Sequence, residues 1–472
     1  MNIDGLISFG AIFLPFFSGL FLLISRLKLY PIKKSVLENL SIISSLGSLA
    51  CFIFLKSSFL FKDLAPIKLT FFNIENFFTN EDLSFSIYLD NFNLNFLIFS
   101  SLIALILSIF HKFYFKKKKH FIFTKQRFYI FSLFLFFLNY MFFASYNLFE
   151  SLIFLILQGS LIFVFSYFDV FKNFATYNIS RNEKINIIGD FLFLFGLLIL
   201  FKCSILSKGY ISACDLNFPE LNMLVSYGYG IIESYEFKIC AICLLGSIFI
   251  KFLMLPFNCY FSFSSNSSGV TFLNNISFYS LGGYFLFLKF LPMFDFISNF
   301  YLILGIIAFL TLITSSVFIL FEKDIKIISG YFYSIINSIL LLSFSILKNE
   351  KILFLFFIFH FILIILLSIL IYKDKLGFKK RLINKQKGFI LERIFILFLE
   401  NLPEKIFKFF DFLNEKIIKN ILILPLIIFD FCIKLFNAKT LKRNIDKIII
   451  MILSIFALFA LLSIFIELLG GI

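Results

Sequence analysis

The sequence contains no tryptophan, and only 15% of its 472 residues carry a charged side chain. Soluble domains average about 25% charged residues, so a soluble globular fold is excluded for a chain of this length. Hydrophobic residues make up 60% of the sequence, and the mean hydropathy is +0.98. Lipid must therefore solvate much of the surface. Tyrosine, with 19 residues, takes the interfacial place that tryptophan often has.

The motifs of a self-contained enzyme are also missing. The sequence has no phosphate-binding loop, cofactor motif or catalytic triad, so we expect no catalytic site and no bound cofactor in this chain. Cys240 and Cys243 form a lone C-x-x-C pair in an apolar run, with no second pair and no nearby histidine. This spacing favours buried helix thiols over a metal site. The first four residues include no basic side chain, so we expect the first apolar run to stay as a helix and not to be a cleaved signal.

Long apolar runs are what the sequence does contain. A helix needs about 20 residues to cross roughly 30 Å of hydrocarbon, and only helices satisfy their own backbone in lipid at this segment length. The pattern predicts an all-α, polytopic transmembrane bundle of about 12 helices. The runs are at about 6–25, 39–56, 93–111, 128–146, 148–168, 185–203, 238–262, 268–291, 298–321, 325–347, 351–372 and 447–470.

The loops between these runs alternate in charge. The basic loops are 26–34, 112–127, 172–184 and 373–393, whereas the loops within 75–90 and 215–236 are acidic. The positive-inside rule then places the basic loops in the cytoplasm and both termini outside, in the cell inner (cytoplasmic) membrane. The same rule explains the net charge of +15, so nucleic acid is not an expected partner.

Four segments follow from this pass along the chain. N-terminal spanning helices occupy 1–112, and a core of further spanning helices occupies 113–372. Residues 373–445 hold a basic segment and, at 389–420, apolar positions at helical spacing among many charges, which predicts a lateral amphipathic helix on the cytoplasmic side. A last spanning helix lies in 446–472.

Ionisable residues inside apolar runs are costly, so each is a functional candidate. The candidates are Glu150, Asp190, Lys251, Lys326 and His360. Glu150 and Asp190 have an alternative as helix N-terminal caps or as side chains that reach toward water. Lys326 has an alternative as an interfacial anchor, and His360 as a satisfied core histidine.

Lys251 is the hardest of these residues to explain as structural. It lies in the run from Phe237 to Phe263, five residues before Pro256, which should break the helix. A buried lysine beside a broken helix is an arrangement that a proton relay uses.

An ordered set of short segments resembles the antiporter-like subunits of respiratory complex I, especially the L subunit of NADH-quinone oxidoreductase. Asn186-Ile187-Ile188-Gly189-Asp190 is similar to the family's N-R-[IV]-G-D, and Lys251 with Pro256 and Asn258 to its K-S-A-Q-x-P signature. The other matching segments are Asn266 to Thr271, Gly282-Gly283-Tyr284, Asp324-Ile325-Lys326 with Tyr331, and Phe359-His360-Phe361.

The resemblance implies antiporter-like inverted repeats, with the second repeat truncated after Tyr372. It implies that the chain couples electron transfer to quinone with proton translocation, and that other subunits handle NADH and quinone. The expected partners are the lipid bilayer and other membrane subunits of a complex I-like assembly. Lys251 would be the central proton acceptor, and Asp190 with Glu150, or Gln158 as a neutral remnant, would tune it. Lys326 and His360 would pass protons laterally.

Departures from the family leave two alternatives open. The family's next histidine falls on Asn275 and a later lysine on Ile364, which would suit a non-pumping scaffold subunit. The same superfamily also includes cation/proton antiporters, membrane hydrogenases and inorganic-carbon uptake subunits.

Overall fold

The computed structural model of the chain describes residues 3–27, 34–62, 66–74, 83–117, 122–166, 173–206, 235–255, 257, 269–295, 297, 299–321, 325–348 and 350–373. They belong to one compact unit, Met1–Asn384. The lateral helix expected at 389–420 and the last spanning helix expected in 446–472 lie outside the described residues.

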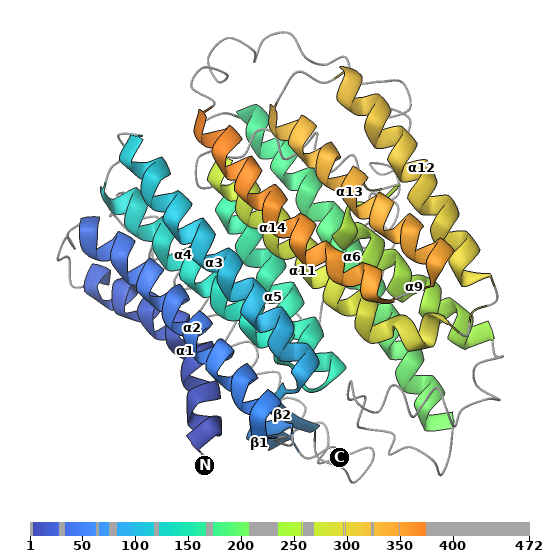
Figure 1. Ribbon diagram of the computed structural model, residues 1–472, viewed down its shortest axis with the longest axis horizontal. Helices are drawn as coiled ribbons and strands as arrows, with labels where there is room; N and C mark the ends of the chain where they lie inside the picture. Colours follow the sequence, from blue (N-terminus) through green and yellow to red (C-terminus); the bar gives the residue numbers. More distant parts are fainter. Residues whose placement is uncertain are drawn as a thin grey trace, which may run out of the picture. The chain divides into compact units, whose positions relative to one another are not determined.

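Eleven α-helices make up most of the described residues, and they follow the first eleven apolar runs in order. The long helices run side by side (Figure 1), so the described part of the chain is a polytopic helical bundle, as predicted. Their bounds are α1 Ile3–Leu27, α2 Lys34–Lys62, α3 Asn91–Lys117, α4 Ile122–Phe143, α5 Leu148–Ser166, α6 Asn173–Leu206, α9 Tyr235–Phe252, α11 Gly269–Phe294, α12 Phe300–Phe321, α13 Ile325–Leu347 and α14 Glu350–Lys373.

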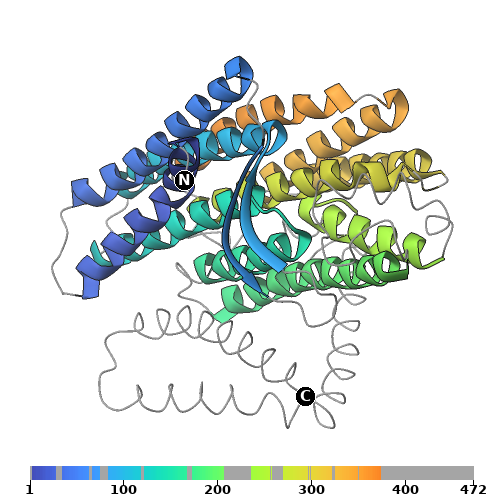
Figure 2. The ribbon, with the colours of Figure 1, turned by 90° about the horizontal axis from the view of Figure 1, so that it is seen from below.

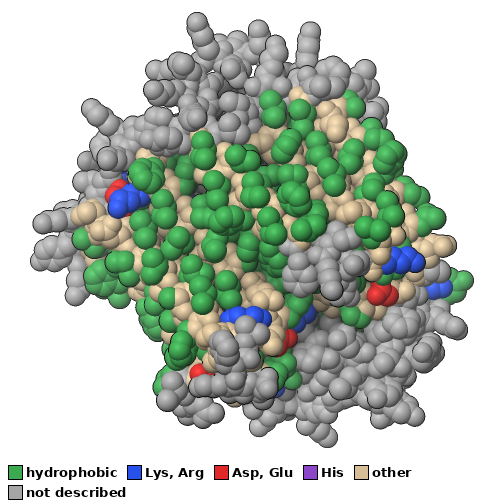
Figure 3. Space-filling view, in the orientation of Figure 1, with side chains coloured by type: hydrophobic (Ala, Val, Ile, Leu, Met, Phe, Trp, Pro, Cys, Tyr) green, Lys and Arg blue, Asp and Glu red, His purple; other side chains and the backbone are tan. Residues whose placement is uncertain are grey.

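Eight helices among the described residues are long and apolar enough to cross a membrane. α12 shows why lipid is the solvent: only 22% of its apolar window is buried, and it exposes large side chains such as Leu302, Ile306 and Phe309. Hydrophobic side chains cover much of the face shown in Figure 3, with few charged groups among them. The chain is therefore a multi-pass membrane protein.

A β-hairpin occupies part of the acidic loop between α2 and α3, where the sequence predicted no regular structure. Strand β1 (Ile67–Ile74) pairs antiparallel with β2 (Leu83–Leu89), with a register irregularity between Thr70 and Phe72. Figure 2 shows the two strands lying against each other along their length. The all-α prediction holds for the bundle and misses this hairpin.

The hairpin is anchored to the turn between α4 and α5. Tyr88 N–H donates to the Ala144 carbonyl at 2.7 Å, and Ser86 N–H donates to Glu150 Oε1 at 2.6 Å. In the same turn, Asn147 Oδ1 accepts the Glu150 N–H at 2.8 Å as an N-cap of α5. The hairpin is thus fixed to the start of α5 by buried polar contacts.

Close packing of α6 on α9 sets the position of the site. A Cβ at Gly196 would stand 2.9 Å from the Leu244 side chain, so any larger residue would force that side chain or the helices to shift. The Cys240 thiol donates to the Gly196 carbonyl at 3.1 Å. Nearer the site, a Cβ on Gly189 would stand 3.1 Å from the Ile250 side chain. Asp190 follows Gly189 and Lys251 follows Ile250, so this contact brings Asp190 and Lys251 close together.

Candidate functional site: a buried lysine and aspartate pair

Lys251 and Asp190 form a buried ion pair between α9 and α6. The Lys251 Nζ lies 2.8 Å from Asp190 Oδ1. Lys251 is only 3% exposed, and the side chain of Asp190 is 14% exposed. An isolated ammonium at this depth would cost several kcal/mol, so the aspartate is what lets the charge remain there.

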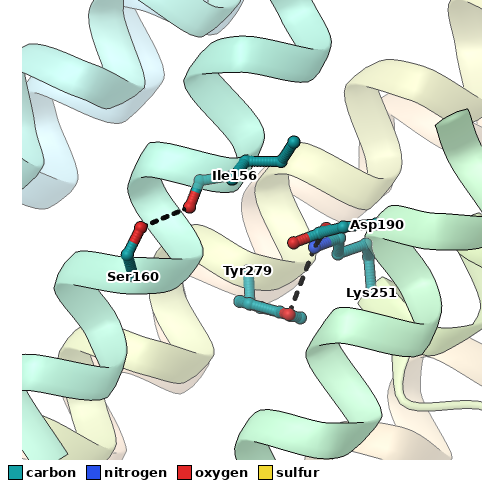
Figure 4. A network of polar contacts seen from close by, with 5 residues as sticks. All are labelled: Ile156, Ser160, Asp190, Lys251 and Tyr279. Atoms are coloured by element: carbon teal, nitrogen blue, oxygen red, sulfur yellow. Dashed lines mark hydrogen bonds and ion pairs between the residues drawn. The ribbon is translucent and has the colours of Figure 1, made fainter. Parts of the chain in front are cut away.

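A tyrosine on α11 completes the coordination of the ammonium. Lys251 Nζ donates to the Tyr279 hydroxyl at 3.1 Å and lies 4.2 Å from the centre of its ring. Figure 4 shows Asp190 and Tyr279 converging on the same nitrogen. α5 closes the other side, because an added Cβ on Gly159 would lie 3.4 Å from Asp190 Oδ2.

The helix that carries Lys251 ends one residue later, at Phe252. Met254 N–H bonds to the Phe249 carbonyl at 2.9 Å and Leu253 N–H to the Ile250 carbonyl at 3.1 Å, which is a Schellman motif. The left-handed position of this motif usually holds glycine, but here Leu253 occupies it with φ 58°. The expected single run 238–262 is therefore interrupted before Pro256, which itself lies outside the described residues.

Neighbouring helices satisfy the backbone that this interruption frees. Asn337 Nδ2 donates to the Phe252 carbonyl at 3.1 Å, and Ser334 Oγ donates to the Leu253 carbonyl at 3.1 Å, both from α13. Leu255 N–H donates to Thr311 Oγ1 of α12 at 3.1 Å. Non-helical backbone at membrane depth persists only where protein or water satisfies it, and here α12 and α13 do so.

His360 sits in a second polar cluster that also uses α11. Its Nε2 lies 3.1 Å from the Ser277 carbonyl, so this nitrogen carries a hydrogen and donates it. Its Nδ1 contacts the Tyr333 hydroxyl, which in turn contacts Ser280 Oγ. Ser280 donates to the Ile276 carbonyl at 2.8 Å.

This cluster can hold His360 in either protonation state without moving a heavy atom. In the neutral ring, Nδ1 accepts the Tyr333 hydroxyl hydrogen. In the charged ring, Nδ1 donates to Tyr333, which then donates to Ser280. Rotation of one hydroxyl therefore accompanies the gain or loss of a proton, which is the property that a relay group needs.

The structure does not bring Glu150 or Gln158 into contact with Lys251. Glu150 Oε2 accepts the Tyr146 N–H at 2.9 Å and Oε1 accepts the Ser86 N–H at 2.6 Å, so its described contacts are with the turn before α5 and with the hairpin. Gln158 donates to Asn139 on α4 at 2.9 Å. Gly159, not Gln158, is the α5 residue against Asp190.

The structure places Asp190 deep inside a helix and Lys326 at the start of one. The alternative that Asp190 caps a helix N-terminus is wrong, because α6 begins at Asn173 and Asp190 lies more than about four turns inside it. Lys326 falls in the first turn of α13, but its side chain lies outside the described residues.

Sequence reasoning missed Tyr279, Tyr333 and Asn337, which contact the two clusters. One signal was available: α11 carries Asn274, Asn275, Ser277 and Ser280 inside an apolar run, and all are buried. Polar positions gathered on one spanning helix indicate a face that meets protein or water and not lipid.

Fold and site together define a polytopic helical membrane protein with buried ionisable groups at an interrupted helix. Neither the search of family models nor that of curated proteins finds a match. Among solved structures, the chain is similar to a chain in the membrane-bound sulfane sulfur reductase, an archaeal respiratory membrane complex, with a TM-score of 0.59 at 14% identity. The match covers 77% of this chain and 70% of that one, so the two share a fold.

Proposed function

We propose that the chain is a proton-conducting membrane subunit of a respiratory complex related to NADH-quinone oxidoreductase. The observation that supports this most is the Lys251–Asp190 pair, buried beside the end of α9. The shared fold with a chain of a respiratory membrane complex agrees with it. In this proposal other subunits carry the redox chemistry, and Lys251 accepts and releases a proton in response.

The buried pair suits this role because its two states differ little in net charge. When Lys251 holds its proton, Asp190 neutralises it, and when it loses the proton to a neighbour, Asp190 can take up a proton from water. The Tyr279 hydroxyl offers the ammonium a third partner, and the His360 cluster lies on the same helix, α11. Residues 190, 251 and 360 are the groups through which protons would pass, with Lys326 as a further candidate.

The test replaces Lys251 with arginine and, separately, with methionine. Arginine keeps the positive charge beside Asp190 but cannot release its proton, so proton uptake per electron transferred should fall to background while the complex still assembles. Methionine should abolish uptake as well. Uptake would be measured with a pH-sensitive dye in inside-out membrane vesicles, and wild-type uptake in K251R would show that the charge serves structure alone.

The chain contains a matched control on the same two helices. Lys202 and Glu236 form a 2.7 Å ion pair between α6 and α9, but their side chains are 62% and 43% exposed. Exposed pairs contribute about 0–1 kcal/mol and need no special environment. Lys202→Met should therefore leave proton uptake unchanged.

A non-pumping scaffold is the second candidate. It is favoured by Asn275 and Ile364, which put an amide and an aliphatic group where the related subunits carry ionisable ones. Neutralising Asp190, Lys251 and Lys326 together discriminates the two. If the complex keeps wild-type proton uptake per electron after this triple change, the chain is a scaffold subunit.

A further inference from the structure

A third buried polar cluster joins α3, α4 and α11, and it includes the one described histidine that the proposed path does not use. His111 is 0% exposed, and its Nε2 lies 3.2 Å from Asn274 Oδ1. Because the amide oxygen accepts, Nε2 carries the hydrogen and Nδ1 is left as an acceptor. Among the described residues, Nδ1 of His111 and Nδ2 of Asn274 have no hydrogen-bond partner.

Tyr129 of α4 adds a third buried group with unused hydrogen-bonding capacity. Its side chain is 1% exposed, its ring lies 6.3 Å from the His111 ring, and its hydroxyl has no hydrogen-bond partner among the described residues. From α2, Glu38 is 7% exposed and interacts electrostatically with Tyr129. Four helices thus place an imidazole, a phenol, an amide and a carboxyl group in one apolar region.

Such a cluster is unusual, because native proteins satisfy the great majority of their buried polar groups. Both ring nitrogens of the buried His360 have partners, whereas Nδ1 of His111 has none among the described residues. Here an imidazole acceptor, a phenol and an amide donor remain available to a transferable proton or to the water that carries it. Imidazole and phenol are also the neutral side chains best able to pass a proton on.

Helix α11 links this cluster to Lys251 and to His360. Asn274 lies five residues before Tyr279, about 7 Å along the helix axis, and three residues before Ser277. Tyr279 contacts Lys251, and the Ser277 carbonyl contacts His360. The next residue after His111 is Lys112, which lies at the basic end of α3 and donates to Asn39 Oδ1 at 3.2 Å in a solvent-exposed contact.

We infer that His111, with Tyr129 and Asn274, is a proton-loading site that passes protons along α11 toward Lys251. On the charge pattern of the loops, the entry faces the cytoplasm. The inference rests on the proposed function, since it needs Lys251 as the acceptor. The net step is transfer of one proton from water to His111 Nδ1, followed by its release toward α11, with no change in redox state.

An exchange of side chains tests the role of the imidazole. His111→Asn should lower proton uptake about tenfold or more while the complex assembles. Combining it with Asn274→His returns an imidazole to the same contact from the opposite helix, so the double variant should recover most of the uptake. Ser108→Ala, which removes a buried 3.0 Å contact to Ser41 one turn earlier on α3, is the matched control and should leave uptake unchanged.

Rescue by added imidazole is a second test, which does not depend on how well the double variant His111→Asn with Asn274→His packs. Added imidazole should restore uptake in His111→Ala and should have no effect on the wild type or on K251R. Wild-type uptake in His111→Asn would overturn the inference, as would an uptake defect that neither the exchange nor imidazole repairs. If either result is found while K251R shows no proton uptake, the inference about His111 fails and the proposed function stands. If K251R shows wild-type uptake, the proposed function itself fails.

Discussion

Gly283 lies directly against Lys251: a Cβ at position 283 would stand 2.7 Å from the Lys251 Cβ and 3.3 Å from its carbonyl carbon. These atoms belong to the base of the side chain and to the backbone, so they cannot swing aside. The position of the Lys251 ammonium therefore depends on residue 283 having no side chain.

We expect Gly283→Ala to push α9 away from α11 and to move Lys251 from Asp190. Overpacking of this kind costs about 1–3 kcal/mol, so thermal stability and proton uptake should both fall. Gly282→Ala is the control, since its Cβ would meet only the Phe142 ring edge at 3.5 Å, an ordinary contact. Equal behaviour of the two variants would show that the close approach does not position Lys251.

At Leu253 we expect glycine to be tolerated better than alanine, the reverse of their ranking in a helix interior. Its side chain is buried, and removing it costs about 2–5 kcal/mol in either variant. Alanine at φ 58° keeps the left-handed strain of about 1–2 kcal/mol, whereas glycine removes it. Chemical or thermal unfolding should therefore find Leu253→Gly less destabilised than Leu253→Ala, and the opposite order would argue against the left-handed cap.

Asn337 is expected to hold the interrupted end of α9. Asn337→Leu leaves the Phe252 carbonyl without its donor, and an unsatisfied buried group costs about 1–3 kcal/mol. Hydrogen exchange of the amides from Ile250 to Leu253 should rise in this variant. Ser338→Ala, one residue along, removes only a bond to the carbonyl of Ile335 on its own helix and should leave that exchange unchanged.

The Tyr333 hydroxyl is predicted to be the group that lets His360 change its protonation state. Tyr333→Phe leaves Nδ1 of His360 without its described partner, so proton uptake should fall while the fold is kept, because the ring itself remains. Tyr284→Phe is a matched control, since the Tyr284 hydroxyl is buried and has no hydrogen-bond partner among the described residues. A similar loss in both variants would indicate a packing effect and not a relay.

The candidate site could be predicted only in part. Lys251 stood out because an ionisable residue inside an apolar run is visible in one dimension, and Asp190 stood out for the same reason. Glu150 was chosen on the same ground, but it contacts the backbone of the hairpin and of the turn before α5, because an apolar run does not show what a residue at its edge will contact. His111 ends an apolar run and went unnoticed, because only its contact with Asn274 sets it apart.

The sequence by itself determined that this is a multi-pass helical membrane protein. Hydropathy over about 20 residues is a local property, and it decides whether a segment is stable as a helix in lipid. It also located the interruption of α9 to within a few residues. Tertiary structure alone decided which groups meet: Lys251 with Asp190, 61 positions apart, and His111 with Asn274, 163 apart. Those pairings depend on how closely helices approach at residues such as Gly189 and Gly283, and packing distances of that kind follow from the whole bundle and not from any one segment.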